Sequence, residues 1–302
     1  MMGESHSTRS PERVSAIRRG RGTLPGVKPS WRESSLELRS GAVRVLEQGE
    51  GPALVWSHGF LHPIALEELT PLRELLGGIP GRRVIRYDAR GHGGSAAGRD
   101  DAANRWESLG ADLLELADAL GIERFVAAGA SMGVAASLHA ALLAPERIEA
   151  LLLLIPPTAW ESRPPQAALY RAMAEILDEK GRGALAAVVK ETLRAQPAAP
   201  GFEPAEEALL EALRGFDPAA LGHLLRGAAE SDLPAPERLA EIEAAALIVA
   251  VRDDPGHPLS TAEVLAERMP FAELRVVESL AEVEAIGAAA IRFLAEVESA
   301  GR

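Results

Sequence analysis

Short apolar runs that each end near Gly, Ser or Asp recur along the chain and define its predicted strands. Between Ser35 and Gln48, the runs SLELRS and AVRVLEQ alternate apolar and polar residues around a Ser-Gly turn, which is typical of a half-buried hairpin. The later runs are continuously apolar, as expected of parallel strands buried on both faces. They read ALVWSHG, RVIRYDARG, RFVAAGAS, ALLLLIPP, ALIVAVRDD and AELRVVES.

Helical patterns separate these runs. They cover Ile64 to Leu76, Trp106 to Leu120, Met132 to Leu143, Thr261 to Arg268 and Glu282 to Leu294. Alternation of strand and helix at this spacing predicts a doubly wound α/β sheet with right-handed crossovers. In such a sheet we expect the functional site at the carboxyl ends of the strands.

Two segments fall outside this alternation. Residues 157–243 read as successive helices broken by Pro and Gly, so we predict a helical cap inserted into a core of residues 33–156 and 244–302. Residues 1–32 form a polar, arginine-bearing segment with little periodicity, which predicts a mobile basic tail. A short amphipathic helix from Val14 to Arg19 is the alternative for that tail.

Composition narrows the function classes. The formal net charge of −12 and the lack of a basic stripe in the folded part argue against a nucleic-acid or anionic-membrane partner. The chain has no cysteine, which excludes disulfides, thiolate zinc sites and cysteine nucleophiles. No secretory signal pattern and no stretch of about 18 apolar residues are visible, so a cytoplasmic location is expected.

The most specific motif is Gly129-Ala130-Ser131-Met132-Gly133, which follows an apolar strand and opens a helix. In this context G-x-S-x-G predicts a nucleophile elbow, a sharp turn that projects the Ser131 hydroxyl outward beside the positive end of a helix. The alternative interpretation is an ordinary turn followed by a serine helix cap.

Two further segments carry a family resemblance. Ser57-His58-Gly59-Phe60 follows the strand ALVW, and Asp88-Ala89-Arg90-Gly91-His92-Gly93-Gly94-Ser95 follows the strand RVIRY. With the elbow, these motifs resemble the α/β-hydrolase superfamily over about residues 35–296. The resemblance implies a mostly parallel eight-stranded sheet flanked by helices, with an inserted helical cap. It also implies that the amides of Phe60 and Met132 form an oxyanion hole, and that His92 is a structural loop histidine.

The same resemblance places the catalytic carboxylate at Asp254, in the segment Arg252-Asp253-Asp254-Pro255-Gly256-His257 after the strand ALIVAV. A turn-forming Asp before Pro is the alternative there. The family pattern then requires a histidine after the last strand, but the sequence reads SLAEVEAIG and has no histidine after His257. Without a nearby base a serine hydroxyl is a weak nucleophile.

Three interpretations of the missing base follow. In the first, His257 has taken over the role, oriented by Asp254 or by Glu161. In the second, His58, His62 or His92 assists Ser131. In the third, the chain keeps the fold but is a non-hydrolytic small-molecule binding protein.

Residues Trp160, Glu161 and Arg163 lie at the start of the predicted cap and are expected near the mouth of a pocket, where Arg163 would bind a substrate carboxylate or pair with Glu161. Neither metal-binding spacing nor a nucleotide-binding glycine motif is present, so no metal or cofactor is expected. The sequence therefore predicts a cofactor-independent serine hydrolase for a small or medium ester or lactone. A carbon-carbon bond hydrolase would share most of these parts.

Overall fold

The computed structural model describes residues 31–70, 79–195 and 206–301. Eight strands form one sheet in the order β1-β2-β4-β3-β5-β6-β7-β8. The strands are β1 (Arg32–Leu38), β2 (Gly41–Gln48), β3 (Ala53–Ser57), β4 (Arg83–Tyr87), β5 (Phe125–Ala130), β6 (Ile148–Leu154), β7 (Ala245–Val251) and β8 (Ala272–Val277). The β1/β2 and β2/β4 pairs are antiparallel, and the remaining pairs are parallel. This is the predicted mostly parallel eight-stranded sheet.

The predicted opening hairpin forms where expected, although β1 begins at Arg32 and so includes the last residue of the segment interpreted as a tail. Gly41 begins β2 with a φ of 110°, a conformation that a glycine adopts without strain. The predicted helix from Val14 to Arg19 and the rest of the tail lie outside the described residues.

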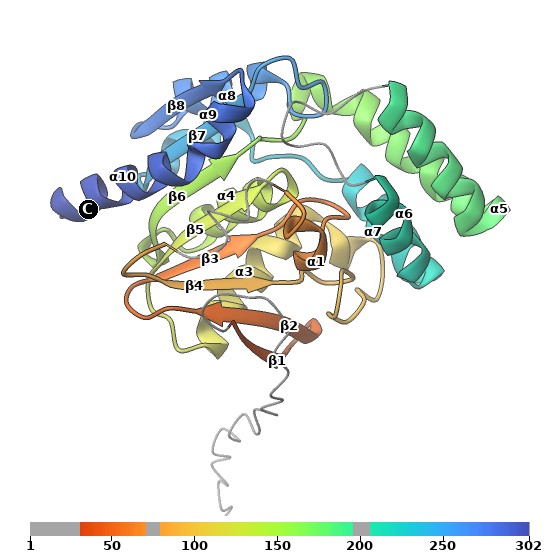
Figure 1. The fold of residues 1–302 in the computed structure, drawn as a ribbon, viewed down its shortest axis with the longest axis horizontal. Coiled ribbons are helices and arrows are strands. Elements are labelled where there is room, and N and C mark those ends of the chain that lie inside the picture. Colours follow the sequence, from red (N-terminus) through yellow and green to blue (C-terminus); the bar gives the residue numbers. More distant parts are fainter. Residues whose placement is uncertain (1–30, 71–78, 196–205, 302) are drawn as a thin grey trace, which may run out of the picture.

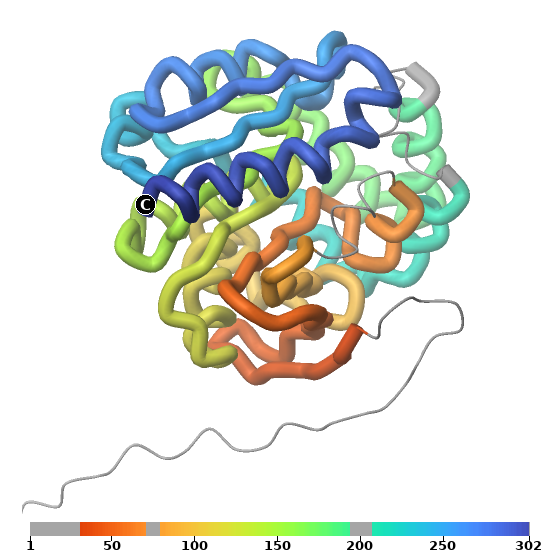
Figure 2. The backbone as a smooth tube through the Cα atoms, turned by 60° about the vertical axis from the view of Figure 1, so that its left-hand side comes forward, coloured from red at the N-terminus to blue at the C-terminus, as the bar shows by residue number. Residues whose placement is uncertain are grey.

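Helices cover both faces of the sheet (Figures 1 and 2). The helices of the core are α1 (Ile64–Glu67), α3 (Trp106–Ala119), α4 (Met132–Leu143), α8 (Leu259–Arg268), α9 (Leu280–Glu284) and α10 (Ile286–Ser299). One face packs against α3, α4 and α8, and the other against α9 and α10, which gives two apolar layers separated by the sheet. The central strands are buried on both faces, as their continuous apolar sequences predicted.

Two predicted helices differ in extent. The helix expected from Ile64 to Leu76 ends at Glu67, and residues 71–76 of its predicted span are not described. The helix expected from Glu282 to Leu294 is instead two helices that meet at Ala285. The first of them, α9, begins earlier than predicted because Ser279 and Glu282 form a capping box at its start.

The inserted region between β6 and β7 contains α5 (Arg163–Ala195), α6 (Glu206–Gly215) and α7 (Pro218–Ala229), called here the inserted helices. In α5 the two predicted helices join at Gly181, whose φ of 75° interrupts the helical backbone. The inserted helices have their own apolar cluster, to which Leu66 of α1 also contributes. Figure 1 shows them together on the right, at the opposite end of the molecule from the C-terminus.

Four 3₁₀ segments complete the described secondary structure. They are η1 (Ala102–Asn104), η2 (Pro145–Arg147), η3 (Trp160–Ser162) and η4 (Pro236–Glu241). No helix of the described residues is long and apolar enough to cross a membrane.

Candidate active site

Ser131 is the single residue between the end of β5 and the start of α4. Its φ of 52° and ψ of −111° lie where a residue with a β-carbon is strained, and its amide donates to the Leu154 carbonyl at the end of the neighbouring strand β6. The chain therefore reverses sharply at one residue, directly from a buried strand into the first turn of a helix. This backbone is what the G-x-S-x-G motif predicts in a strand-to-helix setting.

Gly129 and Gly133 of the motif allow the backbone segments around Ser131 to pack closely against one another. A β-carbon at Gly133 would lie 2.0 Å from the Ser57 carbonyl oxygen of β3, and one at Gly129 would lie 2.6 Å from the Gly133 carbonyl carbon. No side chain fits at either position, so α4 can begin close against the ends of β3 and β5 only because both residues are glycine.

His257 reaches Ser131 from the loop after β7. Its Nε2 lies 3.0 Å from the Ser131 Oγ, and its Nδ1 lies 2.9 Å from the Asp254 Oδ2. A carboxylate only accepts, so the Nδ1 carries the proton and donates to Asp254, which leaves the Nε2 lone pair to accept from the serine hydroxyl. Ser131, His257 and Asp254 thus form one continuous hydrogen-bonded chain.

Asp254 and His257 lie within four residues of each other in the loop after β7, and local hydrogen bonds fix their positions. Asp253 has a φ of 61°, after which the Gly256 amide donates to the Asp254 Oδ1 and the His257 amide donates to the Asp254 carbonyl. Burial of Asp254 raises the pKa of its carboxyl, but the hydrogen bonds and charge of His257 and the Gly256 amide outweigh burial and bring that pKa below its usual range. Asp254 therefore stays ionised beside the imidazole.

The loop that carries the histidine in the family pattern follows β8. In this chain the residues after β8 bond to one another and to the loop after β7. Glu282 accepts from the amides of Glu278 and Ser279, and Arg252 donates to the Glu278 carboxylate. The segment from Glu278 enters α9 at once. His257 approaches Ser131 from the neighbouring strand β7 instead.

The other candidate bases are placed differently. The Nε2 atoms of His58 and His92 accept from the amides of Ala89 and Leu61, and their Nδ1 atoms face the carbonyls of Gly59 and Arg90. Both rings are buried and fully engaged with the backbone. His92 is the loop histidine that the resemblance implied, whereas His62 is half-buried beside Ser131 and is considered below.

The two amides expected to form the oxyanion hole lie next to the serine. Met132 is the first residue of α4, and Phe60 follows Gly59, at which a β-carbon would lie 3.7 Å from the Ser131 β-carbon. Within the described residues, neither the Phe60 amide nor the Met132 amide donates a hydrogen bond to the protein. Two unpaired donors therefore flank the serine.

The structure differs from the expectation for Arg163. The residue is 4% exposed, and its guanidinium donates to the carbonyls of Ser231 and Ala228 and to the Thr158 hydroxyl. The guanidinium also lies 4.1 Å from the centre of the Trp106 ring. Arg163 consequently fastens the start of α5 to the last turn of α7 and the residues just after it, and neither pairs with Glu161 nor reaches out to a substrate carboxylate.

Trp160 is hydrogen-bonded to the residues that follow α7. The Trp160 amide donates to the Asp232 carboxylate and its indole NH donates to the Pro234 carbonyl. Glu161 is exposed, and the carboxylate that the His257 ring contacts is Asp254. No sequence pattern separates these inward and outward orientations, because they depend on where residues 231–234 return to the core.

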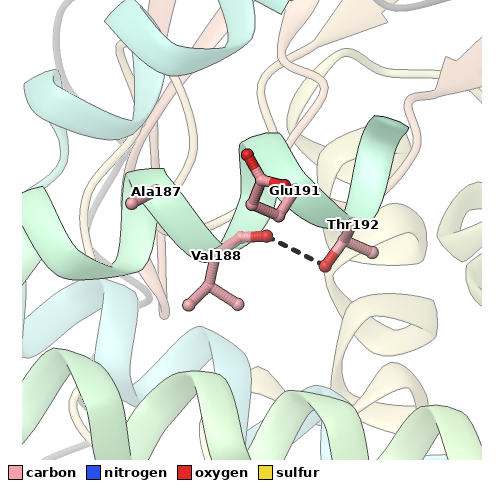
Figure 3. A pocket seen from close by; sticks show the side chains of 4 residues that line it. All are labelled: Ala187, Val188, Glu191 and Thr192. Atoms are coloured by element: carbon pink, nitrogen blue, oxygen red, sulfur yellow. Dashed lines mark hydrogen bonds between the residues drawn. The ribbon is translucent and has the colours of Figure 1, made fainter. Parts of the chain in front are cut away.

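A concave surface on the second half of α5 is lined by Ala187, Val188, Glu191 and Thr192 (Figure 3). The Thr192 hydroxyl donates to the Val188 carbonyl one turn earlier, so it is occupied within the helix. Among the described residues no cluster of His, Cys, Asp or Glu has the arrangement of a metal site.

Comparison with known proteins adds independent evidence. A family model described as alpha/beta hydrolase fold matches residues 52–179. "Putative carbamate hydrolase RutD" of Caulobacter sp. (strain K31) is 31% identical over 225 residues, which cover 70% of this chain and 80% of the relative. The protein of the same name from Stutzerimonas stutzeri (strain A1501) is 31% identical over 204 residues, covering 65% and 72%.

Solved structures agree in fold. A hydrolase from Pseudomonas aeruginosa PA01 superimposes with a TM-score of 0.67 and 26% identity, covering 87% of this chain and 98% of that chain. An enol-lactonase from Burkholderia xenovorans LB400 superimposes with a TM-score of 0.70 and 20% identity, covering 86% and 99%. The predicted fold class is confirmed by these matches.

Proposed function

Since the chain belongs to the α/β-hydrolase fold family, we propose that it is a serine hydrolase that cleaves a small or medium carboxylic ester or lactone through an acyl-enzyme on Ser131. The observation that carries the proposal is the hydrogen-bonded chain from the Ser131 Oγ through His257 to Asp254. A serine needs an adjacent base, and the base needs a third group to orient it.

In the first step, the Ser131 oxygen attacks the carbonyl carbon while its proton passes to the His257 Nε2. Asp254 accepts from the Nδ1 and stabilises the imidazolium that forms. The carbonyl oxygen becomes an oxyanion beside the Phe60 and Met132 amides. Such preorganised donors are usually the largest electrostatic contribution to acyl transfer.

The tetrahedral intermediate then collapses. The imidazolium returns its proton to the leaving oxygen, which departs as an alcohol or, in a lactone, stays attached as a hydroxyl. Water adds to the acyl-enzyme by the reverse order of transfers, giving the carboxylic acid and free Ser131. These steps use only groups of the chain and water, so the proposed reaction requires no cofactor.

Substrate class is set by the pocket rather than the triad. The names of the carbamate hydrolase relatives add carbamates to the compounds to be compared, because a carbamate offers the same carbonyl to the serine. A non-hydrolytic binding protein and a carbon-carbon bond hydrolase are the competing functions, and both predict poor turnover of simple esters.

The test uses a fluorophosphonate probe and a short-chain p-nitrophenyl ester. Wild-type protein is expected to gain the probe mass on the peptide containing Ser131 and to turn over the ester. Ser131→Ala is expected to lose labelling and at least about 10³-fold in kcat. Ser260→Ala, at an exposed serine of α8, is the matched control and keeps both. A wild-type protein that neither labels nor turns over the ester would contradict the proposal.

A further inference from the structure

The residues after Gly59 form a tight turn beside the nucleophile. The His62 amide donates to the Gly59 carbonyl at 3.0 Å, and Leu61 has a φ of 56° inside the turn. A bulky residue with a positive φ is strained and persists only where its surroundings hold it. The strain marks this turn as a segment whose conformation is imposed by its contacts.

Those contacts come from two buried imidazoles. His92 accepts from the Leu61 amide at 3.2 Å, and His58, whose ring centre lies 4.8 Å from that of His92, donates from its Nδ1 to the Gly59 carbonyl at 2.7 Å. The Phe60 ring packs 4.9 Å from the Tyr170 ring of α5. The turn is therefore held from the core side by histidines and from the inserted helices by an aromatic contact.

The held turn presents His62 to the site. A β-carbon built on Gly59 would lie 3.7 Å from the Ser131 β-carbon and 3.8 Å from the His62 β-carbon, so the two side chains flank the same point. Within the described residues no hydrogen bond holds either ring nitrogen of His62, unlike the rings of His58, His92 and His257. An imidazole without a protein partner stands beside the nucleophile.

The environment keeps this imidazole neutral. Burial, together with the neighbouring His58 and His257 acting in the same direction, lowers the pKa of His62 to about 4. A neutral imidazole offers one N–H donor and one acceptor nitrogen, so it can pair with an uncharged polar atom without adding charge next to the His257 base.

From this placement we infer that His62 is a specificity-determining residue that hydrogen-bonds a heteroatom of the substrate close to the scissile carbonyl, on its acyl side. The leaving oxygen must lie toward His257, from which it takes its proton. The carbonyl oxygen lies at the Phe60 and Met132 amides, so the third substituent of the carbonyl carbon, the acyl group, is the one left to face His62. The preferred acyl group thus carries an oxygen or nitrogen near the carbonyl. This inference rests on the proposed serine hydrolysis.

The test compares two esters of equal length and identical leaving group, p-nitrophenyl methoxyacetate and p-nitrophenyl butyrate. The measured quantity is the ratio of their kcat/KM values in wild type, His62→Leu and His62→Gln. Dividing the ratio in wild type by that in a variant cancels the intrinsic reactivity of the methoxyacetate. Thermal unfolding checks that each variant is folded, and the fluorophosphonate probe reports on Ser131 separately.

The expected result is that His62→Leu lowers the preference for methoxyacetate about fivefold or more, the change that one hydrogen bond of ordinary strength provides. His62→Gln restores at least part of this preference, because its amide again offers a donor and an acceptor. A purely structural role for His62 would lower kcat/KM for both esters equally.

One result would overturn the inference while leaving the proposed function intact: an unchanged ratio in His62→Leu, whether both esters keep their kcat/KM or lose it by the same factor, in a protein whose Ser131 still labels. A wild-type protein that neither labels nor hydrolyses either ester overturns the proposed function, and the inference about His62 with it. The labelling result distinguishes the two failures.

Discussion

Asp253 and Asp254 are neighbours in sequence but have opposite surroundings. Asp254 is buried and accepts from the His257 ring, whereas Asp253 is exposed with a φ of 61°. The dipeptide alone does not say which carboxylate is used. The conformation of Asp253 turns one side chain outward and allows the next to face His257.

This pair offers a matched comparison. Asp254→Asn is expected to lower kcat for a p-nitrophenyl ester by about 10²-fold to 10⁴-fold, because an amide in place of the carboxylate does not stabilise the imidazolium and favours the wrong tautomer. Asp253→Asn, which tolerates the same backbone angles, is expected to stay within about twofold of wild type. Equal losses in both variants would show that the loop is merely disturbed, and no loss in Asp254→Asn would remove Asp254 from the mechanism.

The buried ring of His92 predicts how the free energy of unfolding depends on pH. Burial lowers the pKa of its ring to about 3, with His58 adding to the shift, so His92 is neutral in the folded protein and charged in the unfolded chain below about pH 6.5. The unfolded state then binds one more proton at this residue. The contribution to the free energy of unfolding is full above about pH 6.5 and falls as the pH is lowered, by at most about 1.4 kcal/mol per pH unit.

Urea unfolding of wild type and His92→Gln between pH 4.5 and 6.5 measures this contribution. Because Glu67 and Asp112 have raised pKa values and act in the opposite direction, the informative quantity is the difference between the two proteins. Wild type is expected to lose stability more steeply than His92→Gln as the pH falls. Parallel curves would contradict a buried neutral His92.

At the scale of elements, the turn between β5 and α4 depends on Gly133. The Gly133→Ala substitution places a methyl group 2.0 Å from the Ser57 carbonyl oxygen, so the helix must move away from β3. The free energy of unfolding is expected to fall by about 3 kcal/mol or more, or folding is lost.

Gly183 in α5 is the control, because a β-carbon there has nothing within 4 Å. Gly183→Ala is expected to raise the free energy of unfolding by about 0.5–1 kcal/mol, since alanine favours helix. Chemical denaturation measures both changes. A Gly133→Ala protein as stable as wild type would show that α4 does not approach β3 this closely.

Arg163 is expected to act on the attachment of the inserted helices. Arg163→Lys keeps the charge but loses the fork that donates to the carbonyls of Ser231 and Ala228, so stability is expected to fall by about 2–4 kcal/mol. At a temperature where the variant is fully folded, KM should change by the same factor for an ester that carries a free carboxylate and for one that does not. A KM increase confined to the carboxylated ester would restore the substrate role expected from the sequence.

For the whole molecule, the parts that the sequence predicts best are those fixed by local pattern. Buried parallel strands read as continuous apolar runs, and the runs ending at Ser57, Tyr87, Ala130 and Val251 bring the HG segment, the DARG segment, the serine and the Asp254 loop to one edge of the sheet. His257 was a candidate because it follows a strand end, and the structure brings its ring to Ser131.

Other features depend on contacts between distant segments and have no local signal. Arg163 turns inward because residues 228–231 return beneath it, and Leu61 adopts a positive φ because His92, far along the chain, accepts from its amide. His62 was only one of several candidate bases by sequence. Its distinct place depends on a turn that neither composition nor periodicity indicates.

The account rests on a base that comes from the loop after β7 rather than from the loop after β8. The most direct measurement is the second-order rate constant for fluorophosphonate labelling of Ser131 in wild type and in folded His257→Ala. We predict a loss of at least about 10²-fold, since His257 is the proposed group that takes the serine proton. If His257→Ala labels Ser131 as fast as wild type, His257 is not the base and the proposed triad is wrong.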